Sequence, residues 1–164
     1  MEVAEVREGL ESFIPDTFGS DARIENLIES DGHAGLTFLF EVATRAGSTP
    51  YVIKLPPKGV TRKGNTDVYR QAPLLRALYD AGLPVPNVPW AYDENGWFEI
   101  PFIVMERLAG KTFFVWDPAP GLPRDTATAR GYYEQCAVWL ARIHQFDWKH
   151  SLADWETPID LEKD

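Results

Sequence analysis

The residues that point most clearly to chemistry are the run Tyr51-Val-Ile-Lys54, which is followed closely by Pro56 and Pro57. Its apolar, partly β-branched residues predict a short strand that ends near the lysine. A lysine on a rigid strand presents a compact ammonium group, which suits it to gripping phosphate. Strands that carry a lysine at a water-exposed edge are also common. The run therefore indicates either a phosphate-binding group or an ordinary solvated side chain, and the neighbouring segments must decide.

Several other chemical motifs are missing from the sequence. The motifs H-E-x-x-H and G-x-S-x-G do not occur, and the histidines lack the i, i+4 pairing of a helical metal site. The single cysteine, Cys136, excludes an internal disulfide and a cysteine-based zinc site. We expect both Cys136 and His144 to be core residues of a helix.

The composition indicates a folded, acidic domain. The chain has 164 residues, of which 45% are hydrophobic and 13% aromatic, enough to build one core. The net charge of −9 argues against nucleic acid or an anionic membrane as a partner. Lys58, Arg62 and Lys63 form only a local basic patch. The polar N-terminus and the absence of a long apolar run predict neither a signal peptide nor a membrane span, so we expect a cytoplasmic location.

Periodicity predicts one helix followed by strands and a second helix. Apolar residues at helical spacing from Val3 to Phe13 predict a helix that Pro15 closes. A helix is also expected up to Gly82, and Pro73 requires that it either begins near Arg70 or is kinked. The expected strands cover residues 22–29, 37–45, 51–55, 88–92 and 102–107. Their short links favour antiparallel pairing and an α+β class.

The last third of the sequence changes from strand-like patterns to a loop followed by a helical pattern. A loop rich in proline and glycine covers residues 117–123, and Asp125 is the expected N-cap of a long helix. We therefore expect three regions: an N-terminal helix and link (1–21), a nucleotide-binding lobe (22–110) and the start of a truncated helical lobe (111–164). The tail 155–164 is expected to be acidic and loose. The helix should expose an apolar stripe through which two copies could pair as a homodimer, made of Ala129, Tyr132, Cys136, Leu140 and Ile143.

Taken in order, five parts of the sequence resemble the aminoglycoside phosphotransferase family, which includes choline-kinase-like and homoserine-kinase-like small-molecule kinases. The resemblance implies a protein-kinase-like N-lobe, in which an antiparallel five-stranded sheet carries one packed helix, and the first helical part of the C-lobe. The parts that carry it are Asp31-Gly-His-Ala-Gly-Leu-Thr37, Tyr51-Val-Ile-Lys-Leu-Pro-Pro57, Leu74-Leu-Arg-Ala-Leu78 to Gly82-Leu-Pro-Val-Pro86, Pro101-Phe-Ile-Val-Met-Glu-Arg-Leu-Ala-Gly110 and Leu140-Ala-Arg-Ile-His144.

The resemblance also implies roles for particular residues. Lys54 would bind the phosphates of ATP, and Val52, on the same face of the strand, would contact the adenine. The turn from Asp31 to Thr37 would cover the phosphates, and its glycines would allow a close backbone approach; the binding residues implied within it are Gly32, His33, Ala34 and Gly35. Met105 would lie at the back of the adenine pocket, and the backbone of Glu106 and Leu108 would hydrogen-bond the adenine edge.

The sequence departs from the family pattern in two places. Gln71 stands where a glutamate normally orients the lysine, so the grip on Lys54 should be weaker. The family's H-G-D-x-x-x-x-N loop and its I-D-x-E/D segment, which supply the catalytic base and the Mg²⁺ ligands, do not occur. We therefore expect the isolated chain to be inactive.

Three interpretations of function remain at this point. The first is the ATP-binding portion of a phosphotransferase that acts on an unknown small-molecule hydroxyl acceptor, with ATP and Mg²⁺ as cofactors. The second is a non-catalytic ligand-binding or interaction module, either a pseudo-kinase or an unrelated α+β domain. The third is a transferase that uses another nucleotide, such as GTP.

Overall fold

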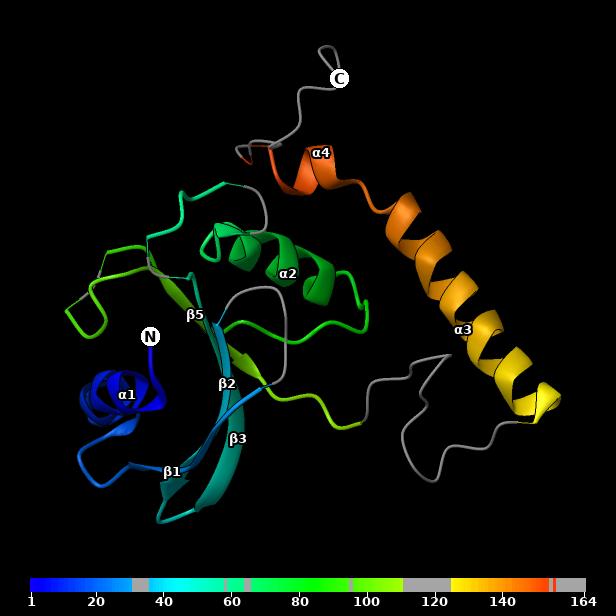
Figure 1. Cartoon of the computed structure of the whole chain (residues 1–164). Helices are drawn as coiled ribbons and strands as arrows, with labels where there is room; N and C mark the ends of the chain where they lie inside the picture. Colours follow the sequence, from blue (N-terminus) through cyan, green and yellow to red (C-terminus); the bar gives the residue numbers. More distant parts are fainter. Residues whose placement is uncertain are drawn as a thin grey trace.

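The computed structural model of the protein describes residues 1–30, 36–57, 59–63, 66–94, 96–110, 125–153 and 155. Within them, five strands form one sheet in the order β1-β2-β3-β5-β4, in which all neighbours are antiparallel (Figure 1). The predicted α+β class and the five-stranded antiparallel sheet are confirmed. The strands are β1 (Arg23–Glu29), β2 (Leu36–Thr44), β3 (Gly47–Leu55), β4 (Trp90–Tyr92) and β5 (Phe102–Glu106).

The hairpin of β2 and β3 is the longest pairing in the sheet. Its register runs from Leu36 opposite Leu55 to Thr44 opposite Gly47. At the turn, the hydroxyl of Thr44 accepts a hydrogen bond from the Ala46 N–H and donates one to the Gly47 carbonyl. Pairing therefore continues up to the turn, and β3 begins four residues earlier than the apolar pattern alone predicts.

Helix α1 (Val3–Phe18) covers one face of the sheet. Alternation along β2 and β3 directs Phe38, Phe40 and Ile53 into this core, where each is fully buried. The ring of Phe13 lies at its centre, with edge-to-face contacts at centroid distances between 5.3 and 6.4 Å. Its partners are Phe18, Trp90, Tyr92, Trp97 and Phe102.

The predicted end of α1 at Pro15 is wrong, because the helix continues to Phe18. Pro15 cannot donate its own N–H to the helical ladder, but its carbonyl still accepts a hydrogen bond from the Gly19 N–H at 3.1 Å. The added turn places the Phe18 ring 4.7 Å from that of Trp90. Aromatic packing therefore compensates for the lost hydrogen bond.

Gly9 explains how closely α1 approaches the loop before β5. A Cβ atom at this position would lie 2.3 Å from the ring of Phe98, which is shorter than any allowed contact. Glycine is unfavourable inside a helix. Here it allows Phe98 to reach the core.

Helix α2 (Gln71–Asp80) packs on the opposite face of the sheet from α1 (Figure 1). Its second residue, Ala72, packs with Ile103 and Met105 of β5. Pro73 lies in the first turn, so the prediction that the helix begins near Arg70 is confirmed. The guanidinium of Arg76 donates to the carbonyls of Val88 and Pro89, at 2.7 and 3.3 Å, which ties α2 to the chain that leads into β4.

Helix α3 (Thr126–Gln145) leads away from the sheet and is followed by the short α4 (Trp148–Ser151). Asp125 is its N-cap as predicted, since its carboxylate accepts a hydrogen bond from the Thr128 N–H at 2.9 Å. No side chain of α3 is buried. The expectation that Cys136 and His144 lie in a core is therefore wrong, because an apolar stripe specifies a face and not the element that covers it. Leu140 and Ile143 are exposed as expected, and pairing of two copies stays a prediction.

The boundary between the second and third regions was predicted between residues 110 and 111. Residues 111–124 lie outside the described part of the chain, so the division into three regions stays a prediction. Among the described residues, no helix is long and apolar enough to cross a membrane.

Candidate functional site

Lys54 lies near the end of β3, on the face of the sheet that carries α2. It stands opposite Thr37 of β2 and Ile103 of β5. The flanking Ile53 and Leu55 point to the other face and are fully buried, whereas Lys54 is only half-buried. The strand is therefore fixed by its apolar residues, and the ammonium group is held next to α2.

Gln71, the first residue of α2, contacts this lysine directly. The Lys54 Nζ donates a hydrogen bond to Gln71 Oε1 at 3.0 Å. Burial lowers the pKa of the Lys54 ammonium. The amide orients the ammonium but brings no opposite charge, so an arriving phosphate would stabilise the charged form.

Replacing Gln71 by Glu should strengthen the hold on Lys54. A carboxylate beside the ammonium raises the pKa of Lys54 and stabilises the unliganded protein by about 0.5 to 1 kcal/mol at neutral pH. This gain should be lost as the pH rises through the folded-state pKa of Lys54. Urea unfolding of Gln71→Glu at several pH values measures it, with Gln71→Met as the control that has no oxygen acceptor. A Glu variant no more stable than the Met variant would contradict the expected pairing.

An apolar surface lies beside Lys54. Val52 stands opposite Leu39 of β2 and Met105 of β5 on the same face. Met105 is only 7% exposed, but Leu39 and Val52 stay partly open, because α2 packs mainly over β5. The flat aromatic face of a base such as adenine could pack on this open part of the sheet.

The predicted adenine contacts lie at Glu106, the last residue of β5, and at Leu108. The Glu106 N–H donates to the Asn87 carbonyl at 3.0 Å, so this N–H is not available to a ligand. Leu108 lies two residues after the strand, and its side chain is 55% exposed to solvent. The predicted adenine contacts of Glu106 and Leu108 stay predictions.

Residues 31–35 of the predicted phosphate-covering turn (31–37), among them Gly32, His33, Ala34 and Gly35, lie outside the described residues. Its last two residues, Leu36 and Thr37, begin β2. The chain on either side of residues 31–35 is described: the Ser30 N–H donates to the Thr37 carbonyl at 2.9 Å. Because Thr37 is the partner of Lys54 across β2 and β3, the turn begins and ends at the lysine end of the sheet.

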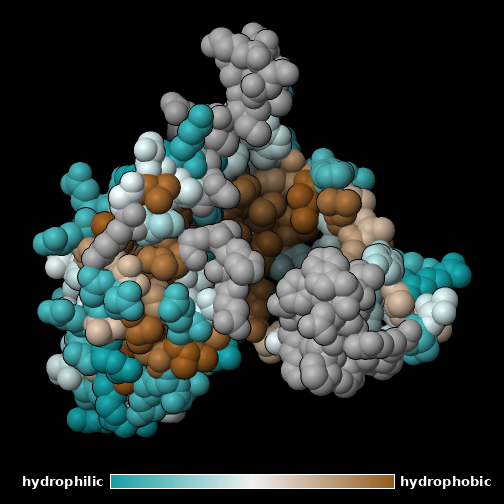
Figure 2. Space-filling view, viewed as in Figure 1, coloured by the Kyte–Doolittle hydropathy of each residue, from teal (hydrophilic) through white to brown (hydrophobic). Residues whose placement is uncertain are grey.

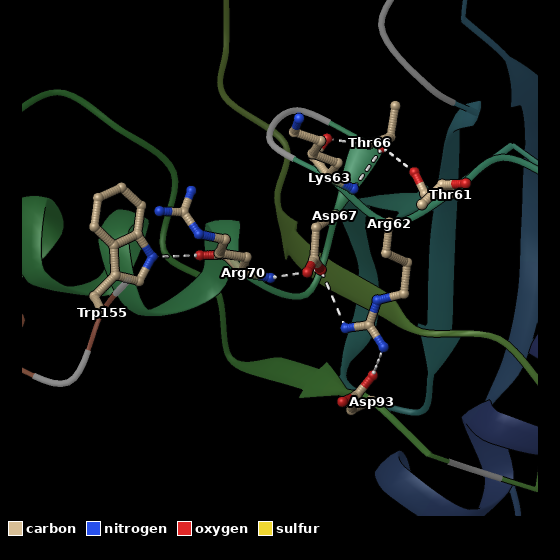
Figure 3. Close-up of polar contacts among 8 residues, drawn as sticks. All are labelled: Thr61, Arg62, Lys63, Thr66, Asp67, Arg70, Asp93 and Trp155. Atoms are coloured by element: carbon tan, nitrogen blue, oxygen red, sulfur yellow. Dashed lines mark hydrogen bonds and ion pairs between the residues drawn. The ribbon is translucent and has the colours of Figure 1, made fainter. Parts of the chain in front are cut away.

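A polar network around Arg62 was not predicted from the sequence (Figure 3). Arg62 donates to Asp93 at 2.6 Å and to Asp67 at 3.1 Å, and Asp67 also accepts from the Arg70 N–H at 3.3 Å. The position of Asp67, four residues before the first residue of α2, was the available signal. Arg62 is therefore engaged with carboxylates on two segments and anchors the link between β3 and α2.

Within the described ranges, no group of three or more His, Cys, Asp or Glu side chains could hold a metal ion. The residues around Lys54 suit the phosphates and the base of a nucleotide. They do not by themselves suit Mg²⁺, which requires several oxygen ligands.

The chain is similar to a known protein family, to a curated protein and to a solved structure. A sequence model of the phosphotransferase enzyme family matches residues 30–164. Acyl-CoA dehydrogenase family member 11 of Rattus norvegicus is 28% identical over 138 residues, which cover 82% of this chain and 16% of the rat protein. A crystal structure from Ralstonia eutropha JMP134, provisionally described as an aminoglycoside phosphotransferase, matches with a TM-score of 0.65 and 19% identity, over 93% of this chain and 42% of that one.

The structural match confirms the predicted kinase-like arrangement of the sheet and helices. The chain spans less than half the length of either protein.

Proposed function

The chain belongs to the phosphotransferase enzyme family, as its motifs predicted, and on that premise we propose that it is the ATP-binding portion of a small-molecule phosphotransferase. The observation that carries the proposal is the placement of Lys54. The lysine is half-buried near the end of a rigid strand, oriented by Gln71 at 3.0 Å, and lies beside a partly open apolar surface. These are the features needed to hold phosphates and a base at the same time.

In this proposal the residues around Lys54 bind ATP and orient it. The ammonium of Lys54 neutralises charge on the α- and β-phosphates, and Gln71 keeps it in place. The adenine packs on Val52 and Leu39, with Met105 behind it. Holding ATP in one orientation lowers the entropy cost of the later transfer step.

The transfer itself joins the acceptor hydroxyl oxygen to the γ-phosphorus. The bond between that phosphorus and the bridging oxygen of ADP breaks, and the hydroxyl proton passes to a base. We place this base and the Mg²⁺ ligands outside this sequence, since the H-G-D-x-x-x-x-N motif is missing from it. Mg²⁺ would neutralise the phosphate oxygens when bound.

Thermal unfolding with and without Mg-ATP tests the binding proposal. A ligand that binds only the folded state stabilises it by about 2.7 kcal/mol at 100 times its Kd. For a chain of this size the expected rise in Tm is about 5–10 °C. The same titration with GTP separates ATP from other nucleotides. An unchanged Tm at millimolar ATP would favour the interaction module, for which the absence of the catalytic motif is the supporting observation.

A further inference from the structure

The chain after α3 passes along the outer side of α2. Just beyond the C-terminal end of α2, Ala81 and Leu83 line a cavity of ≈ 350 Å³ together with Arg142 and Gln145 of α3 and with Phe146. Near the N-terminal end of α2, Pro73 lines a second cavity of ≈ 320 Å³ with residues 151–153 and Trp155. Figure 2 shows hydrophobic residues gathered in the hollow between the body of the molecule and α3. Helix α2 is therefore held by the sheet on one side and approached by residues 142–153 and 155 on another.

Trp155 makes the most specific contact of this segment. Its indole Nε1–H donates a hydrogen bond to the Arg70 carbonyl at 3.0 Å, and the Arg70 guanidinium carbon lies 3.8 Å from the centre of a Trp155 ring (Figure 3). A cation over an indole face and a hydrogen bond from the same ring fix both the backbone and the side chain of Arg70. Trp155 was expected to begin a loose tail, and that expectation is wrong for this residue.

The contact lies next to the lysine site. Arg70 directly precedes Gln71, whose side chain accepts the hydrogen bond from Lys54. On the other side, Asp67 accepts from the Arg70 N–H, and Arg62 holds Asp67. The backbone that enters α2 is thus fixed by Asp67 and by Trp155. A shift of that backbone would move the Gln71 oxygen relative to Lys54.

We propose that Trp155 is a positioning residue, which fixes the start of α2 so that Gln71 holds Lys54 ready for phosphate. The inference rests on the proposed nucleotide-binding role of Lys54. It links the segment after α3 to the start of α2 through one side chain, across 85 positions of sequence. A purely structural alternative is that Trp155 only covers Pro73 and the buried Leu152.

The first test needs no nucleotide. Trace acetylation with acetic anhydride across pH, followed by mass spectrometry, gives the pKa of Lys54 in each variant. Trp155→Ala should move this pKa up toward the ordinary lysine value, because Lys54 loses its fixed, half-buried place. Trp155→Phe keeps the stacking but cannot donate the hydrogen bond, so its value should be intermediate. Trp148→Ala removes another tryptophan of the same segment and should change nothing.

The second test uses Mg-ATP binding. Trp155→Ala should weaken the Kd by about tenfold, as expected for loss of one orienting contact to a charged group. In the Gln71→Ala variant, Trp155→Ala should weaken the Kd less than twofold further. The reason is that Trp155 acts on Lys54 through Gln71, and this side chain is already removed.

Three outcomes decide the matter. A shifted Lys54 pKa, together with non-additive Kd values, supports the proposal. A lowered Tm with an unchanged Lys54 pKa overturns it and leaves Trp155 a structural role. If the unmodified protein binds no ATP, the proposed function fails, and the Lys54 pKa alone still decides whether Trp155 positions this lysine.

Discussion

Replacing Lys54 by Met should remove most of the rise in Tm that Mg-ATP produces. The lost contact joins an ammonium to phosphate, and hydrogen bonds to charged groups contribute about 2 kcal/mol, or about thirtyfold in Kd. At an ATP concentration 100 times the unmodified Kd, the stabilisation then falls from about 2.7 to about 0.9 kcal/mol. Parallel thermal scans of the two proteins measure this difference.

The unliganded Lys54→Met variant should be at least as stable as the unmodified protein at neutral pH. Burial lowers the pKa of Lys54 below its ordinary value of 10.5, which means that folding disfavours the charged side chain. The unmodified protein therefore gains stability relative to the variant as the pH rises from the folded-state pKa toward 10.5. Lys54→Arg is the matched control, since it keeps the charge but not the compact ammonium. If Mg-ATP raised the Tm of Lys54→Met as much as that of the unmodified protein, the proposed contact between Lys54 and phosphate would be contradicted.

Replacing Phe13 by Ala should cause the largest loss of stability, about 3–5 kcal/mol. The ring is fully buried between α1 and the sheet and contacts aromatic rings of β4, of the loop before β5 and of β5, besides Phe18 of its own helix. The surrounding rings are large and rigid, so the space left behind cannot close easily. Since whole domains are stable by only about 5–15 kcal/mol, the variant should unfold at much lower urea concentrations.

Phe18→Ala is the control for this experiment. Phe18 packs on the edge of the same cluster and is only partly buried, so its loss should be clearly smaller. Neither change should alter the Lys54 pKa, because α1 covers the opposite face of the sheet from Gln71. Equal losses in the two variants would show that Phe13 is not the centre of this core.

The strands and the lysine site were predictable because their signals are local. Alternation of apolar residues marked β2 and β3, and the lysine at the end of one apolar run marked the candidate site. The pairing of Gln71 with Lys54 was implied by the family resemblance and not by a local pattern, and the structure places the two side chains 3.0 Å apart. For the strands and the lysine itself, a few neighbouring residues carried the information.

The contacts that were missed join distant parts of the chain. Arg62 meets Asp93 across 31 positions, and Trp155 meets Arg70 across 85. No local pattern distinguishes such an arginine or tryptophan from a solvated one. The continuation of α1 past Pro15 was missed for a related reason, since the rings that stabilise its last turn come from β3 and β4.

The two methionines allow a direct test of the central claim, that the α2 face of the sheet binds ATP. Met105 lies on that face behind Val52, whereas Met1 packs against the α1 core on the opposite face. A sample labelled with ¹³C in its methionine methyl groups gives one signal for each, and Met105→Leu assigns them. Titration with Mg-ATP should shift the Met105 signal and leave Met1 unchanged. A shift of Met1 alone, or no shift of either signal at saturating ATP, would contradict the claim.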